Sequence, residues 1–438
     1  MEEISVGTRK KLYRHIMPFL FLAYVVAFLD RTNVGFAALT MNPELGFTAE
    51  IFGFATGLFS IGYLLFEIPG AIWAEKWSAK KWIVRIMVTW GIVGALFGFI
   101  QEDWHFYSLR FLLGVAEGGF IPGVLVFLNH WFPKKERAKA IGWFYIGLPI
   151  SQVVGGPLAA IFLDLNFLSF SGWRWLFIIE GIMAVIVGIL VAFYLKDSPK
   201  DVKWLDSDEK ETLMNQLQRE KDEITANTKH PWKEIFTNTI IIRVAISMLL
   251  FGIGFYGFNY FIATMTKELA ELSNANVGLL LTIPFLAAAI GLYFNSAHSD
   301  KTQERRWHTA IPWTVGAIGL LLIAYGPSQP VFLIFSISIA AIGLNSCFGA
   351  FWSIPQNYFT GIVAAGGIGV VNFVGNIGGF IGPTVTGLLN ESTGGFNFSL
   401  LFWVISLLLG VGLILSLPKS TSIDQTFTPD KKNINKTV

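Results

Sequence analysis

Long runs of hydrophobic residues follow one another along this chain, and short polar stretches separate them. About twelve of the runs reach the roughly 20 residues that a helix needs to cross the apolar core of a bilayer. Their expected spans are 16–39, 51–73, 82–101, 106–130, 138–163, 173–195, 238–262, 276–297, 309–326, 330–353, 362–389 and 398–417. The pattern therefore predicts an all-α polytopic membrane protein.

One long polar segment, from Lys196 to Lys233, separates the sixth run from the seventh. We expect a solvated linker with a short amphipathic helix at this place. The predicted organisation is an amino-terminal six-helix bundle over 1–195, a cytoplasmic linker over 196–237, and a carboxyl-terminal six-helix bundle with a cytoplasmic tail over 238–438.

The two halves of the sequence also repeat each other. When the chain is shifted by 225 residues, AEKWSAKKW (74–82) falls on SDKTQERRW (299–307), and the acidic, basic and tryptophan positions coincide. A repeat of this length predicts two bundles related by an axis along the membrane normal. Such an architecture places a substrate site between the bundles, near the midplane of the bilayer.

Composition and charge agree with a membrane protein and orient it. Hydrophobic residues make up 53% of the chain and charged residues only 14%, against about a quarter in soluble domains. The single cysteine, Cys347, excludes a disulfide framework within the monomer.

Lysine and arginine cluster in the tails, the linker and alternate loops, so we expect both termini in the cytoplasm. The first run is too long for a cleavable signal peptide.

Four ionisable residues lie inside the hydrophobic runs, where each costs several kcal/mol unless it is paired or lines a wet cavity. They are Asp30, Arg31, Arg110 and Glu117. Arg110 and Glu117 are seven residues apart and share a helix face, so we expect them to act as partners. Asp30 and Arg31 are adjacent and point in directions roughly 100° apart around their helix, so they can contact different neighbouring helices. If the first and fourth helices touch, the four charges converge, either as an ion-pair network that sets helix register or as a site for an anion and for protons.

The repeated loops resemble the signature loop of the major facilitator superfamily. Within it, YVVAFLDRTNVGFA, FEIPG, RFLLGVAEGGFIPGV, HWFPKKERAKAIG, WRWLFIIEG and VNFVGNIGGFIGP resemble the anion:cation symporter family, which includes bacterial carriers of tartrate, phthalate, hexuronates and galactonate. The resemblance implies anion binding at Arg31 and Arg110 and proton transfer at Asp30 and Glu117. We expect gating by the loop residues Glu75, Lys76, Asp300, Lys301 and Arg306. Ala71, Ser78 and Gln303 replace glycines that are usual in these loops.

The second half carries no comparable buried charge, since Phe255, Tyr256 and Phe335 stand at the repeat positions of Asp30, Arg31 and Arg110. It offers neutral hydrogen-bonding side chains instead: Tyr256, Asn259, Tyr260, Asn345, Trp352, Gln356, Asn372 and Asn376. We expect substrate contacts at Tyr256, Asn259, Asn372 and Asn376, and at Tyr24 and Gln152 of the first half. Each of these can also serve helix packing alone.

Three further features allow both a functional and a structural interpretation. Glu67 is a candidate for a gate or a proton path. Glu180 could pair with Arg174 in a structural role. The glycine-rich stretches QVVGGP (152–157) and VGNIGGFIGP (374–383) permit close helix contacts, either for rocking of the bundles or for static packing.

These features favour a secondary active transporter that carries a small organic anion together with protons. The carboxylate could be a sugar acid, a tartrate-like acid or an aromatic acid. An anion exchanger or a uniporter stays open, and a transporter-like sensor is the weaker alternative because no output domain is evident. The motifs HExxH, GxSxG and the Walker loop are absent, so we expect no enzyme. We also expect no metal, no cofactor other than the coupling protons, no nucleic-acid partner, and a monomer surrounded by lipid in a bacterial inner membrane.

Overall fold

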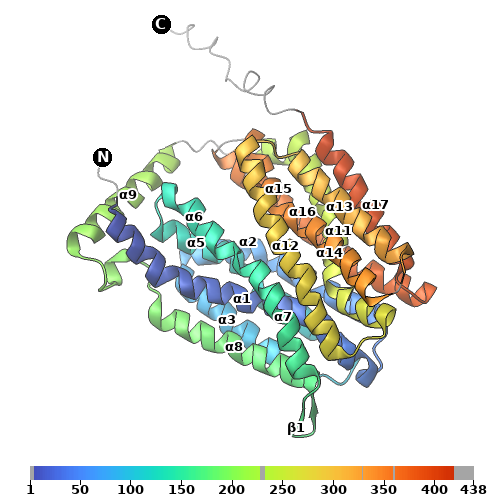
Figure 1. Cartoon of the computed structure of the whole chain (residues 1–438). Helices are drawn as coiled ribbons and strands as arrows, with labels where there is room; N and C mark the ends of the chain where they lie inside the picture. Colours follow the sequence, from blue (N-terminus) through green and yellow to red (C-terminus); the bar gives the residue numbers. More distant parts are fainter. Residues whose placement is uncertain (1–3, 227–231, 328, 359–360, 419–438) are drawn as a thin grey trace.

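The computed structural model describes residues 4–226, 232–327, 329–358 and 361–418. Within these residues, 12 helical spans are long and apolar enough to cross a membrane. They match the runs expected from the sequence one for one. The described strands form a single small hairpin of β1 (Asn166–Phe167) and β2 (Phe170–Ser171). The protein is an all-α, multi-pass membrane protein, with two six-helix bundles side by side (Figure 1).

The amino-terminal bundle consists of the first six spans. Its elements are α1 (Val6–Leu45), α2 (Ala49–Lys76), α3 (Ala79–Leu96) with η1 (Phe97–Phe99), α4 (Asp103–Glu117), α5 (Phe120–Trp131), α6 (Lys134–Tyr145), α7 (Gly147–Leu163) and α8 (Gly172–Tyr194). The fourth span is split into α4 and α5 at Gly119, which has φ 86° and lies directly on Gly70 of α2. A side chain there would be strained and would meet the Cα of Gly70 at 2.7 Å.

The carboxyl-terminal bundle contains the last six spans and follows the linker. The linker elements are η2 (Pro199–Asp201), α9 (Ser207–Ala226) and α10 (Trp232–Thr237). The bundle elements are α11 (Thr239–Ala270), α12 (Asn274–Thr302), α13 (Trp307–Tyr325), α14 (Pro330–Ser346), α15 (Phe348–Tyr358), α16 (Gly361–Thr393) and α17 (Asn397–Leu415). The expected amphipathic linker helix is α9, and most of the expected tail lies outside the described residues.

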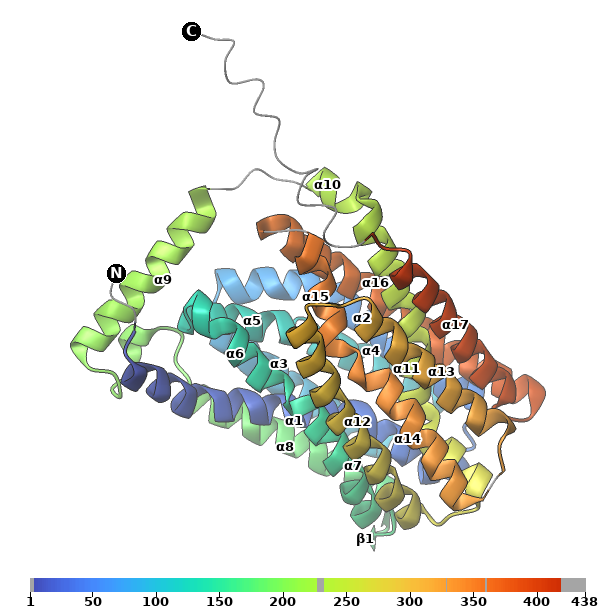
Figure 2. The ribbon, with the colours of Figure 1, turned by 45° about the horizontal axis from the view of Figure 1, so that its top comes forward.

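The two linker helices belong to different halves. Glu209 of α9 accepts hydrogen bonds from Oγ1 of Thr8 at 3.0 Å and from Nζ of Lys11 at 2.7 Å, both on α1. Helix α10 packs on α11 and α16 instead. Figure 2 shows α9 beside the start of α1 and α10 over the carboxyl-terminal bundle. We call this end of the molecule the linker end, and the opposite end, where β1 and β2 lie, the hairpin end.

The most extensive contacts between the bundles are those of three helix pairs, α2 with α16, α7 with α12, and α1 with α11. Near the hairpin end, two of these helix pairs bring backbone directly against backbone. A Cβ at Gly156 would lie 2.2 Å from the carbonyl oxygen of Gly278, and one at Gly53 would lie 2.3 Å from that of Pro383. Such distances are shorter than any side chain allows. The halves are therefore closed tightly against each other at the hairpin end.

Candidate functional site

An ion pair between Arg31 and Glu117 lies inside the amino-terminal bundle. Arg31 on α1 donates from Nε to Oε1 of Glu117 on α4 at 2.7 Å, and its Nη2 lies 2.5 Å from the same oxygen. The Glu117 side chain is 1% exposed and that of Arg31 is 14% exposed. Because guanidinium groups bind carboxylates through neighbouring N–H groups, Glu117 occupies N–H groups of Arg31 that could bind another carboxylate.

Aromatic rings hold the Arg31 guanidinium in place. Its Cζ atom lies 5.1 Å from the ring centres of Phe28 and Phe59 and 4.9 Å from that of Tyr63. Cation–π attraction favours a cation at such distances. The rings restrict the guanidinium, so that its position does not depend on Glu117 alone.

Arg110 is buried, but its expected pairing with Glu117 is wrong. Its Nη2 donates instead to the hydroxyl of Tyr260 on α11 at 3.4 Å. Its guanidinium also lies 5.1 Å from the ring centre of Phe59. Residues seven apart on one helix are separated by about 10 Å along its axis, whereas Arg31 reaches Glu117 from the side. Arg110 thus joins the two bundles, and none of the ion pairs among the described residues includes it.

Asp30 makes no ion pair with either arginine among the described residues, although both arginines and Glu117 lie near enough to interact with it electrostatically. A Cβ at Gly94 of α3 would lie 3.4 Å from Oδ1 of Asp30, and the indole of Trp90 on α3 also faces the carboxyl group. The side chain is 3% exposed. Asp30 and Arg31 contact different neighbours, as their adjacent positions on α1 allow, and the four charges lie in one region without forming a single ion-pair network among the described residues.

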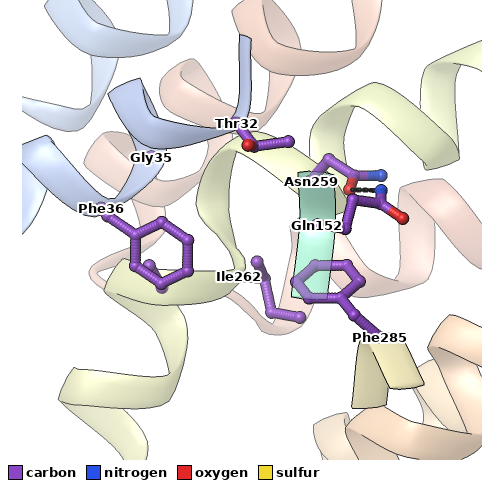
Figure 3. A pocket seen from close by; sticks show the side chains of 8 residues that line it. Thr32, Gly35, Phe36, Gln152, Asn259, Ile262 and Phe285 are labelled. Atoms are coloured by element: carbon purple, nitrogen blue, oxygen red, sulfur yellow. Dashed lines mark hydrogen bonds between the residues drawn. The ribbon is translucent and has the colours of Figure 1, made fainter. Parts of the chain in front are cut away.

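Neutral polar groups of the carboxyl-terminal bundle face this charged region. Gln152 Nε2 on α7 donates to Asn259 Oδ1 on α11 at 3.3 Å and so crosses between the bundles. Both residues line a small pocket beside Thr32 of α1 (Figure 3). Its remaining lining residues are Gly35, Phe36, Ile262, Ala263 and Phe285.

Other expected contacts lie deeper toward the linker end. The Tyr256 hydroxyl donates to Asn376 Oδ1 at 3.1 Å. Asn372 on α16 donates from Nδ2 to Oε1 of Glu67 on α2, which is a further polar link between the bundles. These positions agree with substrate or gate roles, which stay predictions.

Tyr24 is 1% exposed and packs among aromatic rings. Its ring centre lies 4.2 Å from that of Phe144, 4.7 Å from that of Phe28 and 5.5 Å from that of Tyr145. It is not among the residues that line the pocket of Figure 3, so its expected substrate contact stays a prediction. The side chain of Gln356 lies outside the described part of the structure.

The expected gating residues lie at the linker end, each within its own bundle. Glu75 contacts Nε2 of His130 at 3.2 Å, and Asp300 pairs with Nη1 of Arg305 at 2.6 Å. Arg306 donates to the carbonyl oxygen of Leu415 at the end of α17. Lys76 and Lys301 are exposed. Contacts of this kind fasten a loop to its own bundle, and gating stays a prediction.

Two features escaped prediction from the sequence. Arg174 pairs with Glu44 at 3.2 Å rather than with Glu180, because both Arg174 and Glu44 lie at the hairpin end. Glu180 is instead buried and accepts a hydrogen bond from Asn33. An acid in a hydrophobic run was a usable signal for Glu180, but nothing in the sequence indicated its partner. The contact of Arg110 with Tyr260 likewise depends on how the two bundles meet.

Comparison with known proteins agrees with this architecture. The chain matches the family described as Major Facilitator Superfamily over residues 20–383 and 273–436. It is 39% identical to a protein of Agrobacterium vitis named "Putative tartrate transporter", with 95% of each chain covered. It is 36% identical to the "Quinolone resistance transporter" of Acinetobacter baumannii, with 92% of each chain covered.

A solved structure shares the fold. It belongs to a bacterial homologue of the human lysosomal transporter Spinster in an inward-facing, unoccupied conformation, with a TM-score of 0.79 at 18% identity over 96% of this chain and 98% of that one. Two bundles with a polar site between them are the organisation of a secondary transporter. The chain belongs to the major facilitator superfamily: it is a membrane transporter and not an enzyme.

Proposed function

We propose that this protein is a proton-coupled symporter of a small organic anion, a carboxylate, that works by alternating access. The observation that carries the proposal is the buried Arg31–Glu117 pair, in which an internal carboxylate occupies the place that a substrate carboxylate would take. The relative named for tartrate supports a hydroxy acid of this size as the first candidate.

The two arginines suit a substrate with two acidic groups. Arg31 can exchange Glu117 for one substrate carboxylate, and Arg110 offers a second guanidinium whose Nε is buried without a hydrogen-bond partner among the described residues. The neutral amides of Gln152 and Asn259 can then bind hydroxyl groups. A dicarboxylate with hydroxyl groups, such as tartrate, uses all of these donors and acceptors.

Coupling follows from the competition for Arg31. When a substrate carboxylate displaces Glu117, the freed carboxylate is buried without a counter-charge, which is costly unless it takes up a proton. The loaded, neutralised site can then reorient. After proton release on the other side, Glu117 pairs with Arg31 again and expels the anion.

The charge distribution supports placing the linker end in the cytoplasm. The closed hairpin end would then face outward. Both termini would be cytoplasmic in a bacterial inner membrane. No cofactor besides the coupling protons is part of the proposal.

The test uses Glu117→Gln, which mimics a permanently protonated carboxyl, in proteoliposomes with labelled tartrate. We expect normal counterflow but no accumulation driven by a pH difference. If the variant still accumulates tartrate, the coupling proton is carried elsewhere, with Asp30 as the next candidate. If wild-type protein exchanges tartrate but ignores the pH difference, the protein is an exchanger or a uniporter.

A further inference from the structure

A lysine of the carboxyl-terminal bundle contacts the main chain of the amino-terminal bundle at the hairpin end. Nζ of Lys267 on α11 donates to the carbonyl oxygen of Leu39 on α1 at 3.1 Å. Leu39 is 3% exposed. Lysine side chains near the ends of membrane helices commonly extend toward water at the interface. The ammonium group of Lys267 ends instead on the main chain of a buried residue across the contact between the bundles.

The carbonyl group of Leu39 is available because Pro43 lies four residues later in the same helix. In an α-helix each carbonyl accepts from the N–H group four residues on, and proline has no N–H group. Pro43 lies inside α1, which continues to Leu45. The carbonyl oxygen of Leu39 therefore lacks its helical donor, and Lys267 supplies one from the other bundle. A buried carbonyl without any donor would be costly, so Pro43 and Lys267 act as a pair.

The two bases at the hairpin end make different kinds of contact. Arg174 pairs with Glu44 and donates to the carbonyl oxygens of Gly98 and Ile100, all in its own bundle. Lys267 joins the bundles, and none of the ion pairs among the described residues includes it. Its bond to a neutral carbonyl can therefore break without leaving a carboxylate unpaired, and the freed ammonium group can be hydrated.

Polar side chains near this bond in the sequence are unsatisfied while the hairpin end is closed. Oγ1 of Thr40 and Oδ1 of Asn42 on α1, and Oγ1 of Thr264 on α11, are buried without a hydrogen-bond partner among the described residues. Thr40 follows Leu39, and Thr264 stands about one helical turn before Lys267. Water would satisfy these groups if the contact opened. The closed state therefore needs an interaction that offsets their cost.

We propose that Lys267 is a positioning residue for transport, which keeps the hairpin end closed through the carbonyl oxygen that Pro43 leaves free. The bond forms when the bundles approach each other at this end, and it breaks when the end opens. The proposal rests on the alternating access of the proposed function, but it requires no particular substrate or coupling ion.

The test measures how often the hairpin end opens, and it is made without substrate. Thr384 on α16 lies in the contact with α2, a different pair of helices. Its Oγ1 is buried, and a Cβ at Gly57 would lie 2.6 Å from it. In a Cys347→Ala background, Thr384→Cys places a thiol that a bulky, membrane-impermeant maleimide reaches only when this contact opens. The labelling rate of purified protein in lipid nanodiscs then follows the fraction of open molecules.

Three variants in this background break the bond from its two ends. Lys267→Ala should raise the labelling rate about tenfold or more, because a buried carbonyl loses a charged donor, whereas Lys267→Arg keeps a donor and should stay within about threefold of wild type. Pro43→Ala restores an N–H group that competes for the carbonyl oxygen, so it should raise the rate by a smaller factor. Lys267→Ala/Pro43→Ala should label no faster than Lys267→Ala, because both changes affect the same bond.

Two matched controls change the same types of residue where they do not join the bundles. Arg174→Gln removes the other base at the hairpin end, and Pro18→Ala removes the other proline of α1; both should label at the wild-type rate. A rate for Lys267→Ala no higher than that for Arg174→Gln overturns the proposal. A rate for Pro43→Ala no higher than that for Pro18→Ala also overturns it. Lys267→Met, which keeps the apolar stem, replaces Lys267→Ala if that variant does not fold.

The tartrate assay separates the two proposals. Wild-type protein that neither exchanges nor accumulates tartrate contradicts the proposed function only, because labelling is measured without substrate. Wild-type protein that transports tartrate, together with Lys267→Ala that labels at the wild-type rate, contradicts only the role of Lys267.

Discussion

The two bundles share a fold and a signature loop, but they differ in the side chains that they place near their contact. One bundle contributes ionisable groups there, and the other contributes mainly neutral polar groups. The amino-terminal bundle places Arg31, Arg110 and Glu117 near the contact with its partner, whereas the carboxyl-terminal bundle meets them with amides and phenols such as Asn259 and Tyr260. An ion in the membrane interior must be matched by a counter-ion or by water. One bundle can therefore bind and release charge while the other supplies shape and hydrogen bonds.

The same contrast holds in the contacts that cross between the bundles. Among the described residues, three links between side chains cross the interface, Arg110 with Tyr260, Gln152 with Asn259, and Glu67 with Asn372. At the hairpin end a fourth link joins Nζ of Lys267 on α11 to the carbonyl oxygen of Leu39 on α1 at 3.1 Å. In the first and third links the charged partner comes from the amino-terminal bundle and the neutral one from the other. Such links can break during reorientation without leaving an unpaired charge in the carboxyl-terminal bundle.

The largest expected effect is on stability when the internal ion pair is broken. Arg31→Ala leaves Glu117 buried without its partner, which typically costs about 3–5 kcal/mol. Thermal unfolding in detergent should show a marked loss for Arg31→Ala and recovery in the double variant Arg31→Ala/Glu117→Gln. Equal stability of the single and double variants would contradict the pairing. Arg110→Ala should gain nothing from Glu117→Gln, because the two residues do not pair.

The second prediction concerns binding of the anion. Arg31→Lys keeps the charge but loses the planar fork of N–H groups, so tartrate affinity measured by calorimetry should fall at least tenfold. Arg31→Ala/Glu117→Gln, which keeps the fold, should abolish binding. Arg174→Lys changes an arginine at the hairpin end and serves as the control. Unchanged affinity in Arg31→Lys would remove Arg31 from the binding site.

The third prediction concerns the uncharged hydrogen-bonding side chains of the carboxyl-terminal bundle. A single uncharged hydrogen bond contributes about 0.5–1.5 kcal/mol, so Asn259→Ala or Tyr256→Phe should weaken tartrate binding by up to roughly tenfold. The loss should shrink for a dicarboxylate of the same length without hydroxyl groups. An effect as large as that of Arg31→Lys would mean that charge recognition is shared by both bundles.

The smallest expected effect is at the link between Glu67 and Asn372. Asn372→Ala removes a neutral donor near the linker end, and we expect tartrate affinity within about threefold of wild type. Transport rate should change more than affinity, because the link must form and break in each cycle. Rates and affinities that change by the same factor would indicate a substrate contact instead of a gate.

The sequence was sufficient for features that depend on one helix at a time. The twelve spans, the linker helix α9 and the positions of Asp30, Arg31, Arg110 and Glu117 inside the bundle follow from hydrophobic length and from the cost of charge in lipid. Partners could not be predicted in the same way. Helical spacing predicted that Glu117 would pair with Arg110 on the same helix, but Glu117 pairs with Arg31 on another helix.

The pairing of Asn33 with Glu180 had no local signal for the same reason. The two residues are 147 positions apart, and they meet because α1 packs on α8. Periodicity describes the faces of a helix, whereas the choice of neighbour depends on small residues at the crossings, such as Gly94 between Asp30 and Gly181. These contacts are fixed by tertiary packing, which single-helix patterns do not contain.

The backbone contacts at the hairpin end matter for how easily protons can leak across the membrane between the two bundles. Where Gly156 lies on Gly278 and Gly53 lies on Pro383, main chain meets main chain without intervening side chains. Because these contacts leave no space between the two backbones, we expect them to hinder the passage of water, and of protons along it, between the bundles. A substitution that adds even one methyl group to either glycine must push the helices apart and hydrate the gap. We therefore expect these four residues, which carry no reactive group, to help keep the hairpin end closed to water and protons.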